Sequence, residues 1–345
     1  MTMDARKFRI LQAIIDDYIL TAIPVGSRTI SKKYEMGLSS ATIRNEMSDL
    51  EELGYLDQPH VSAGRIPSAK AYRLYVDSMM RRSRLSEDEV RLIRRYFDRR
   101  IDGVEMVMQQ TAQALSEVTQ YTAMVLPPVL ELNRLRHIQL VPLMEGRALL
   151  VVVTDTGFAR DAVIRVPEHM RVDELEKLSR LLTARLYDCR MDQVAERIQG
   201  ELGAELRERR AFLSQVAETI ERQMTPDARS VELSGATNML HYPEYSDMAK
   251  ARSFLAAVEG RDALYGMLKR ASQVEFCITI GAENDLAPLQ DCSVVTATYR
   301  IGELPVGSFG VIGPTRMNYS KVVSVLEYMR RSLGEVLSNY IEEDE

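Results

Sequence analysis

Helix-breaking residues divide the N-terminal part of the chain into short helical stretches, and this punctuation constrains the fold more than any other feature. Apolar residues recur at the spacing of one helix face over residues 5–21, which predicts an amphipathic helix. The Pro-Val-Gly segment at 24–26 ends it, and Ser27 is placed to cap a second helix over residues 28–34. Gly37, which tolerates a positive φ, is expected to make the tight turn that follows.

A third helix and an irregular tail follow this turn. Ser39 or Ser40 is expected to cap the helix, and Gly54 to terminate it. Its buried stripe is predicted to consist of Ile43, Met47, Leu50 and Leu53. The next residues favour a short strand at 55–58, a loop rich in glycine and proline at 60–67, and a helix at 68–80. This order is typical of a helix–turn–helix followed by a wing-like loop.

Double-stranded DNA is the partner that this pattern favours. An α-helix fits the major groove, where arginine binds guanine and asparagine binds adenine through paired hydrogen bonds. The helix N-terminus favours a phosphate, and lysine or arginine in the wing suits the backbone or the minor groove. We expect DNA contacts from Ser39, Ser40, Thr42, Arg44, Asn45, His60, Ser62, Arg65, Lys70 and Arg73, with Lys32 and Lys33 extending the footprint.

Charge supports this interpretation without deciding it. Residues 1–84 hold 13 Lys+Arg against 10 Asp+Glu, a net charge of +3, whereas the remainder holds 31 against 40, a net charge of −9. Asp49, Glu51 and Glu52 would repel DNA if they faced it. A three-helix packing module, or one that binds another protein, therefore stays open as an alternative.

The rest of the chain predicts two further units. An antiparallel meander is expected at 137–142, 147–154 and 159–166, followed by helices near 172–188, 191–201 and 204–224. Because a meander and helices can bury their own core, residues 131–228 are expected to form a separate unit.

The segments on either side of this unit predict mixed structure. A capping box at Ser86 and Glu89 opens a helix to about residue 100, before a second helix over 104–120 and a strand over 121–126. Later segments predict helices near 247–258 and 261–271, strands at 274–280, 293–300 and 306–312, and a helix over 319–342. The narrow apolar stripe of that last helix indicates a core seam more than a helix-pair interface.

Enzymes, metal proteins and membrane proteins are disfavoured. Four histidines and three cysteines are scattered without the spacing of a triad or a zinc site, so no catalytic residue, metal or cofactor is expected. The glycines at 302–313 spell neither a dinucleotide fingerprint nor a P-loop. No apolar run is long enough to cross a bilayer and no secretory signal opens the chain, so a reducing cytoplasm is the expected compartment.

Several longer motifs identify a resemblance to the HrcA family of heat-inducible transcription repressors. The motifs are LSSATIRNEM at 38–47, LEELGYL at 50–56, SAGRIP at 62–67, Tyr72-Arg73, GATNML at 235–240 and GVIGPTRMNY at 310–319. They occur in order, and the resemblance runs from about Arg6 to Tyr340. Ala71 departs from the family, which often has glycine before Tyr-Arg.

The resemblance implies an α+β multidomain protein. It implies a winged helix-turn-helix at 1–84, a GAF-like α/β domain assembled from 88–130 and 229–345, and an inserted dimerising domain at 131–228. It further implies a homodimer that binds an inverted-repeat operator upstream of chaperone operons, with an active form that the chaperonin GroEL promotes.

A ligand-sensing regulator is the second alternative, since GAF-like domains often bind small molecules. The C-terminal motifs carry the polar residues Thr237, Asn238, Thr315, Arg316 and Asn318. Arg316 suits an anion, but side chains of this kind more often fix loops by hydrogen bonds to the backbone. The latter interpretation is preferred.

Overall fold

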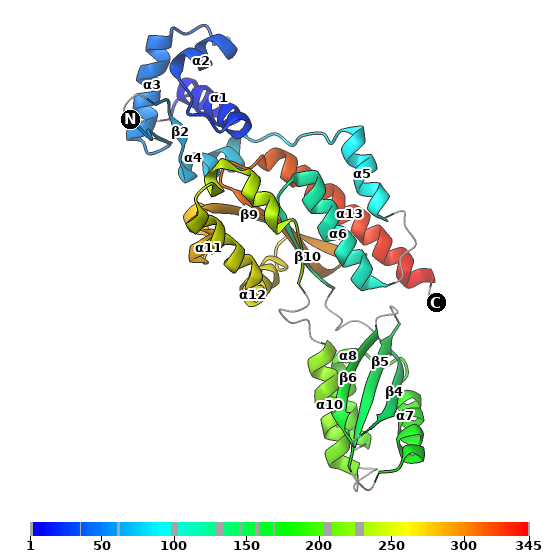
Figure 1. The fold of residues 1–345 in the computed structure, drawn as a ribbon. Helices are drawn as coiled ribbons and strands as arrows, with labels where there is room; N and C mark the ends of the chain where they lie inside the picture. The colour runs from blue at the N-terminus through cyan, green and yellow to red at the C-terminus, as the bar shows by residue number, and fades with distance from the viewer. Residues whose placement is uncertain are drawn as a thin grey trace.

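The computed structural model describes residues 3–34, 36–60, 63–97, 103–128, 134–144, 146–155, 159–167, 170–202, 209–224 and 231–343. It is a mixed helical and sheet protein with three groups of elements arranged along its length (Figure 1). We call them the N-terminal unit (residues 3–80), the sheet unit (87–128 and 231–343) and the three-stranded unit (134–224). The N-terminal unit and the three-stranded unit lie at opposite ends of the molecule (Figure 1).

The N-terminal unit packs three helices against a small antiparallel sheet. Its elements are α1 (Ala5–Thr21), α2 (Ser27–Lys33), α3 (Ser40–Glu52), β1 (Leu56–Asp57), β2 (Ile66–Pro67) and α4 (Ala69–Leu74), which continues as a π-helical turn (Tyr75–Met79). Positive φ at Gly37 and Gly54 confirms the predicted turn and helix end. Ser39 caps α3 by accepting a hydrogen bond from the Thr42 amide (3.1 Å).

Two local predictions in this unit were wrong. Ser27 does not cap α2 but is its first residue. Gly26 holds the cap position with extended backbone, and its carbonyl accepts the first helical bonds from the Thr29 and Ile30 amides. Leu53 lies just beyond α3 and is only half-buried, because the helix ends at Glu52, one residue before this position of the apolar stripe.

The sheet unit is a five-stranded antiparallel sheet between two helical layers. Its strand order is β7-β3-β10-β9-β8, and its elements are α5 (Glu87–Phe97), α6 (Val104–Thr119), β3 (Thr122–Leu126), β7 (Glu232–Ser234), α11 (Met248–Glu259), α12 (Arg261–Ala271), β8 (Phe276–Ile280), β9 (Cys292–Ile301), β10 (Leu304–Pro314) and α13 (Tyr319–Glu343). Helices α6 and α13 cover one face, and α11 and α12 the other (Figure 1). The predicted apolar stripe of the last helix is a core seam, since its described members from Val322 to Leu333 are buried.

The three-residue strand β7 was not predicted from the sequence. It pairs with β3, so that Ala123 lies opposite Ser234. The chain therefore leaves the sheet after β3, builds the three-stranded unit, and returns beside the strand that it left. The capping box that opens α5 is confirmed: the Glu89 carboxylate accepts from the Ser86 amide (2.8 Å), and the Ser86 hydroxyl from the Glu89 amide (3.2 Å).

The three-stranded unit contains the predicted meander followed by helices, and the first residues of the helix predicted near 204–224 lie outside the described residues. It contains β4 (Leu135–Leu143), β5 (Arg147–Thr154), β6 (Ala159–Arg165), α7 (Val172–Leu186), α8 (Met191–Arg197), a π-helical turn (Ile198–Leu202) and α10 (Arg210–Met224). Helix α7 closes the edge of β4, where hydroxyls of Ser179 and Thr183 accept from the Leu140 and Ile138 amides (2.9 and 3.0 Å). One face of the sheet is buried under the helices, and the opposite face is partly exposed.

Candidate nucleic-acid interface

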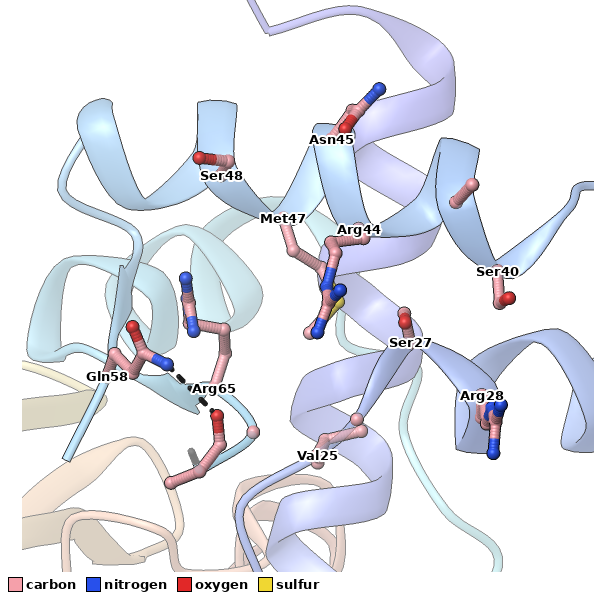
Figure 2. A pocket seen from close by; sticks show the side chains of 14 residues that line it. Val25, Ser27, Arg28, Ser40, Arg44, Asn45, Met47, Ser48, Gln58 and Arg65 are labelled. Carbon is pink, nitrogen blue, oxygen red and sulfur yellow. Dashed lines mark hydrogen bonds between the residues drawn. The ribbon is translucent and has the colours of Figure 1, made fainter. Parts of the chain in front are cut away.

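An open hollow of ≈ 900 Å³ lies in the N-terminal unit, between the start of α2, the exposed face of α3 and the loop before β2 (Figure 2). It is lined by Val25, Gly26, Ser27, Arg28, Ser40, Ala41, Arg44, Asn45, Met47, Ser48, Gln58, Ala63, Gly64 and Arg65. Three of these residues are arginines, and no aspartate or glutamate is among them. The hollow is therefore a positively charged, polar surface built by residues from three separate elements.

Helix α3 presents a polar face to this hollow because its apolar stripe points the other way. Ile43 and Leu50 are fully buried against the core of the unit. Arg44, Asn45 and Ser48 lie on the exposed side of the helix. Arg44 reaches from α3 toward Ser27 at the start of α2 and the segment that carries Val25, as Figure 2 shows. Among the residues that the structure describes, neither Arg44 nor Arg28 has an ion-pair partner, so both guanidinium groups remain available to a ligand.

The carboxylates late in α3 are mostly neutralised within the unit. The ammonium of Lys7 lies 2.9 Å from both the Glu46 and the Asp49 carboxylates. These hydrogen bonds raise the pKa of Lys7 well above its ordinary value. Glu51 pairs with Arg65 instead (2.7 Å). Of the three acidic residues that argued against DNA, only Glu52 is exposed, at the end of α3.

Arg65 is held in place by both its backbone and its side chain. Its amide and carbonyl pair with those of Val25, at 2.9 and 2.8 Å, which joins the loop before β2 to the segment between α1 and α2. Its guanidinium donates to Glu51 (2.9 Å), and the side chain is only 18% exposed. The close approach of this loop to the Val25 backbone requires glycine at position 64, because a Cβ there would lie 2.5 Å from the Val25 carbonyl. Arg65 thus shapes one wall of the hollow.

The other predicted contact residues lie in different parts of the N-terminal unit. Ser40 lines the hollow with Arg44, Asn45 and Arg65, whereas Ser39 and Thr42 form the helix cap, their hydroxyls 2.9 Å apart. His60 is exposed in a turn beside the hollow's loop, and Ser62 lies outside the described residues. Lys32 and Lys33 are exposed on α2, and the Lys33 ammonium pairs with Asp17 (2.5 Å).

Lys70 and Arg73 are directed elsewhere. The Lys70 ammonium donates to the Leu53 carbonyl (2.8 Å) and lies 4.4 Å from the centre of the Tyr55 ring, so it closes the end of α3. Arg73 donates to the Glu283 carboxylate (2.9 Å) and to the Ile278 carbonyl (2.7 Å), which belong to the sheet unit. Neither side chain lines the hollow.

Four polar residues of the hollow were missed: Ser27, Arg28, Ser48 and Gln58. Ser48 follows Arg44 by one helical turn, so helical spacing was the signal that identifies it. Gln58 donates to the Ala63 carbonyl across the loop (3.2 Å; Figure 2). Arg28 carries no sequence signal, because only the packing of α2 on α3 brings its helix to this surface.

Asn238, Asn318 and Arg316, three of the five polar residues of the C-terminal motifs, make contacts within the protein. The Asn238 amide donates to the Ser116 hydroxyl (3.0 Å), and the Asn318 carbonyl oxygen accepts from the Lys321 amide at the start of α13 (3.1 Å). Arg316, the candidate for an anion, is already paired with Glu244 (2.5 Å). Within the described ranges, no group of histidine, cysteine and carboxylate side chains has the arrangement of a metal site, and no helix there is long and apolar enough to span a membrane.

Comparison with known proteins assigns the family. The family described as HrcA protein C terminal domain matches residues 105–323. The heat-inducible transcription repressor HrcA of Brevibacillus brevis is 42% identical over 337 residues, covering 98% of each chain. The protein of the same name from Symbiobacterium thermophilum is 44% identical over 338 residues, covering 97% of this chain and 98% of its own.

A solved structure described as a hypothetical protein shares the fold. It superposes with a TM-score of 0.64 at 22% identity, over 98% of this chain and all of its own. The family match and the relatives, which align from end to end, leave one assignment: this chain belongs to the HrcA family of heat-inducible transcription repressors.

Proposed function

We propose that the N-terminal unit, as a domain over residues 1–84, is a winged helix-turn-helix that binds operator DNA through the hollow and the exposed face of α3. One observation supports this most: no carboxylate lines the hollow, whose exposed helix face carries Arg44 and Asn45 and whose walls carry Arg28 and Arg65. The internal pairing of Asp49 and Glu51 removes most of the repulsion that DNA would meet. The other outcome, a module that binds protein, has no comparable support.

The contacts suggest a division of roles within this interface. Arg44 and Asn45, on the exposed face of α3, are the proposed base readers, with Ser40 and Ser48 beside them. Arg28 is the proposed phosphate contact on the opposite wall. His60 and Ser62 stay in the proposed contact set as wing residues, whereas Lys70 and Arg73 are withdrawn from it because their cationic groups are bound inside the protein.

The three-stranded unit, as a domain over residues 131–228, is proposed to join two copies into a homodimer. Its uncovered sheet face carries a cross-strand row in which Val141 lies opposite Leu149, and Leu149 opposite Val163. Val141 and Val163 are 39% and 56% exposed. Exposed apolar residues gathered on one sheet face are typical of an interface. A two-fold dimer matches the symmetry of an inverted repeat.

Two further parts of the proposal rest on the family resemblance. The sheet unit, over residues 88–130 and 229–345, corresponds to the GAF-like domain. GroEL is proposed to promote the active repressor, so that heat-damaged clients that occupy the chaperonin lower the amount of active repressor. Repressor that keeps full operator affinity through heat stress without chaperonin would contradict this mechanism.

The test of DNA binding is a titration against a fluorescent duplex with an inverted repeat from a chaperone-operon promoter, and a scrambled duplex of equal length. We expect a preference of roughly 10³-fold or more for the repeat, and weaker binding as salt rises. Arg44→Ala should weaken operator binding by roughly 5- to 150-fold, the value of one bidentate base contact. Arg252→Ala, at an exposed arginine on α11, is the matched control.

The outcomes separate the two candidate functions. A folded Arg44→Ala variant that binds the operator as tightly as wild type would contradict the proposed interface. Absence of specific binding by wild type, with and without chaperonin and ATP, would favour the module that binds protein.

The dimer is tested in the same way. Val163→Glu places a charge in the exposed row and should convert the dimer to a monomer in analytical ultracentrifugation. Val172→Glu is the matched control, because Val172 is a similarly exposed valine of the same unit at the start of α7. A dimer that persists in the first variant would exclude this face.

A further inference from the structure

The connection between the N-terminal unit and the sheet unit does not by itself orient one on the other. Residues 80–86 form neither helix nor strand. A segment of this kind links two bodies without fixing the angle between them. The orientation must therefore be set by contacts across the junction.

The first of these contacts is made by Arg73 of α4. It donates from Nε to Glu283 at 2.9 Å and from Nη2 to the Ile278 carbonyl at 2.7 Å, and its side chain is 32% exposed. Binding one acceptor within β8 and another in the turn that follows it with one planar guanidinium restricts rotation as well as separation. Glu283 also accepts from the Ile280 amide (2.9 Å), so the acceptor is itself held in place.

The second contact runs in the opposite direction. Arg316, which follows β10, donates to the Ile19 carbonyl near the end of α1 (3.3 Å). Its side chain is only 10% exposed, and its guanidinium pairs with Glu244 (2.5 Å) and lies 5.4 Å from the centre of the Tyr242 ring. Since Glu244 and Tyr242 both belong to the sheet unit, they present Arg316 to α1 as a fixed donor.

Aromatic packing fills the space between the two arginine contacts. Tyr72 of α4 is 2% exposed, and its ring lies 5.9 Å from that of Tyr319 at the start of α13. The Ser83 hydroxyl adds a hydrogen bond to that of Ser320 (2.6 Å). The junction is thus a packed seam with a guanidinium contact from each side.

We infer that Arg73 and Arg316 are positioning residues for DNA recognition. They fix the orientation of the N-terminal unit on the sheet unit, on which the separation and angle of the two DNA-binding faces in a dimer depend. This inference rests on the proposed function. Two rigidly held faces fit one half-site spacing, whereas two faces on flexible connections accept many. The two arginines therefore determine which spacing between half-sites the repressor accepts, without touching DNA.

The test uses the full-length protein and three duplexes: a single half-site, the inverted repeat, and the repeat with about 5 bp inserted at its centre, which turns one half-site by about half a helical turn. Wild type should bind the repeat roughly 10²- to 10⁴-fold more tightly than the half-site, and should lose most of this advantage on the lengthened repeat. The variant is Arg73→Ala combined with Arg316→Ala. It should keep half-site affinity within about twofold and lose roughly tenfold or more of the preference between the two spacings.

Two further variants protect the result from a folding defect. Glu283→Gln removes the ion pair without leaving a cavity and should reduce the spacing preference in the same direction. Charge reversal, Arg73→Glu combined with Glu283→Arg, should recover much of the spacing preference that Arg73→Glu alone loses. Arg270→Ala is the control, because it removes an exposed ion pair with Asp285 inside the sheet unit.

The outcomes are distinguishable. Normal half-site binding together with an unchanged spacing preference in the double variant would overturn the inference and leave the proposed function standing. Failure of wild type to bind even the half-site would overturn the proposed function and the inference with it.

Discussion

Replacement of Gly64 by alanine is expected to separate the loop before β2 from the segment between α1 and α2. A Cβ at this position would lie 2.5 Å from the carbonyl carbon and oxygen of Val25 and 2.6 Å from the Pro24 carbonyl oxygen. An ordinary contact begins near 3.4 Å, so the clash amounts to about 0.9 Å. All three atoms are backbone, and no flexible side chain can move aside.

The free-energy cost of Gly64→Ala follows from the backbone groups that must move. Forcing a methyl group into packed backbone costs about 1–3 kcal/mol. Displacing the loop also breaks the two hydrogen bonds between Val25 and Arg65 (2.8 and 2.9 Å), each worth about 0.5–1.5 kcal/mol net. Since some of the strain is relieved when the bonds break, we expect a total loss of about 2–4 kcal/mol in local stability.

The assay is hydrogen exchange at the Val25 and Arg65 amides, which are protected by these two bonds. A loss of about 2–4 kcal/mol should accelerate their exchange roughly 30- to 700-fold, because 1.4 kcal/mol corresponds to a factor of ten. Gly26→Ala is the matched control, since the nearest atom to its Cβ would be 4.0 Å away. Unchanged exchange in Gly64→Ala would refute the argument from close contact. Operator binding should weaken as well, because Arg65 forms one wall of the hollow.

Three other changes are expected to have measurable effects. Ser39→Ala should lower stability by about 0.5–2 kcal/mol in urea unfolding because it removes the cap of α3, whereas Ser40→Ala should change it little; equal losses would contradict the cap assignment. Tyr72→Phe should raise the melting temperature, because the buried Tyr72 hydroxyl has no hydrogen-bond partner among the described residues; a lower value would show that the hydroxyl is satisfied. The hydrogen bonds from Arg73 lower the pKa of Glu283 below its ordinary 4.5. The ionised Glu283 carboxylate therefore stabilises the fold above about pH 4.5, and this contribution is lost as the pH falls below that value. The stability of Glu283→Gln should fall less steeply with acid than that of wild type, and identical pH profiles would contradict this.

The N-terminal unit was predictable because its information is local. The helix over residues 5–21 was predicted with the bounds of α1, and Gly37 and Gly54 marked positions that need a positive φ. Such signals depend on near neighbours in the chain, as caps and helix periodicity do. The stripe of α3 from Ile43 to Leu50 was predictable for the same reason.

Most strands were predicted from the sequence, but the strands with which they pair were not. Three strand-like segments joined by short turns identified the meander, since its three strands are consecutive in the chain. It did not reveal β7, whose three residues carry too little pattern and are a strand only because β3 lies beside them. Pairing between segments distant in the chain is decided by the packing of the whole sheet.

The family, the helix–turn–helix pattern and the residue types that suit DNA follow from the sequence alone, because these depend on local order and on motifs. Which of those side chains are available to a ligand depends on the tertiary structure. It placed Arg28 beside Arg44, paired Asp49 and Glu51 within the unit, and directed Arg73 to the sheet unit. The sequence does not distinguish an arginine or lysine that faces solvent from one that is paired with a carboxylate. The pairing depends on the three-dimensional arrangement, which brings the carboxylate within a few ångströms of the cation.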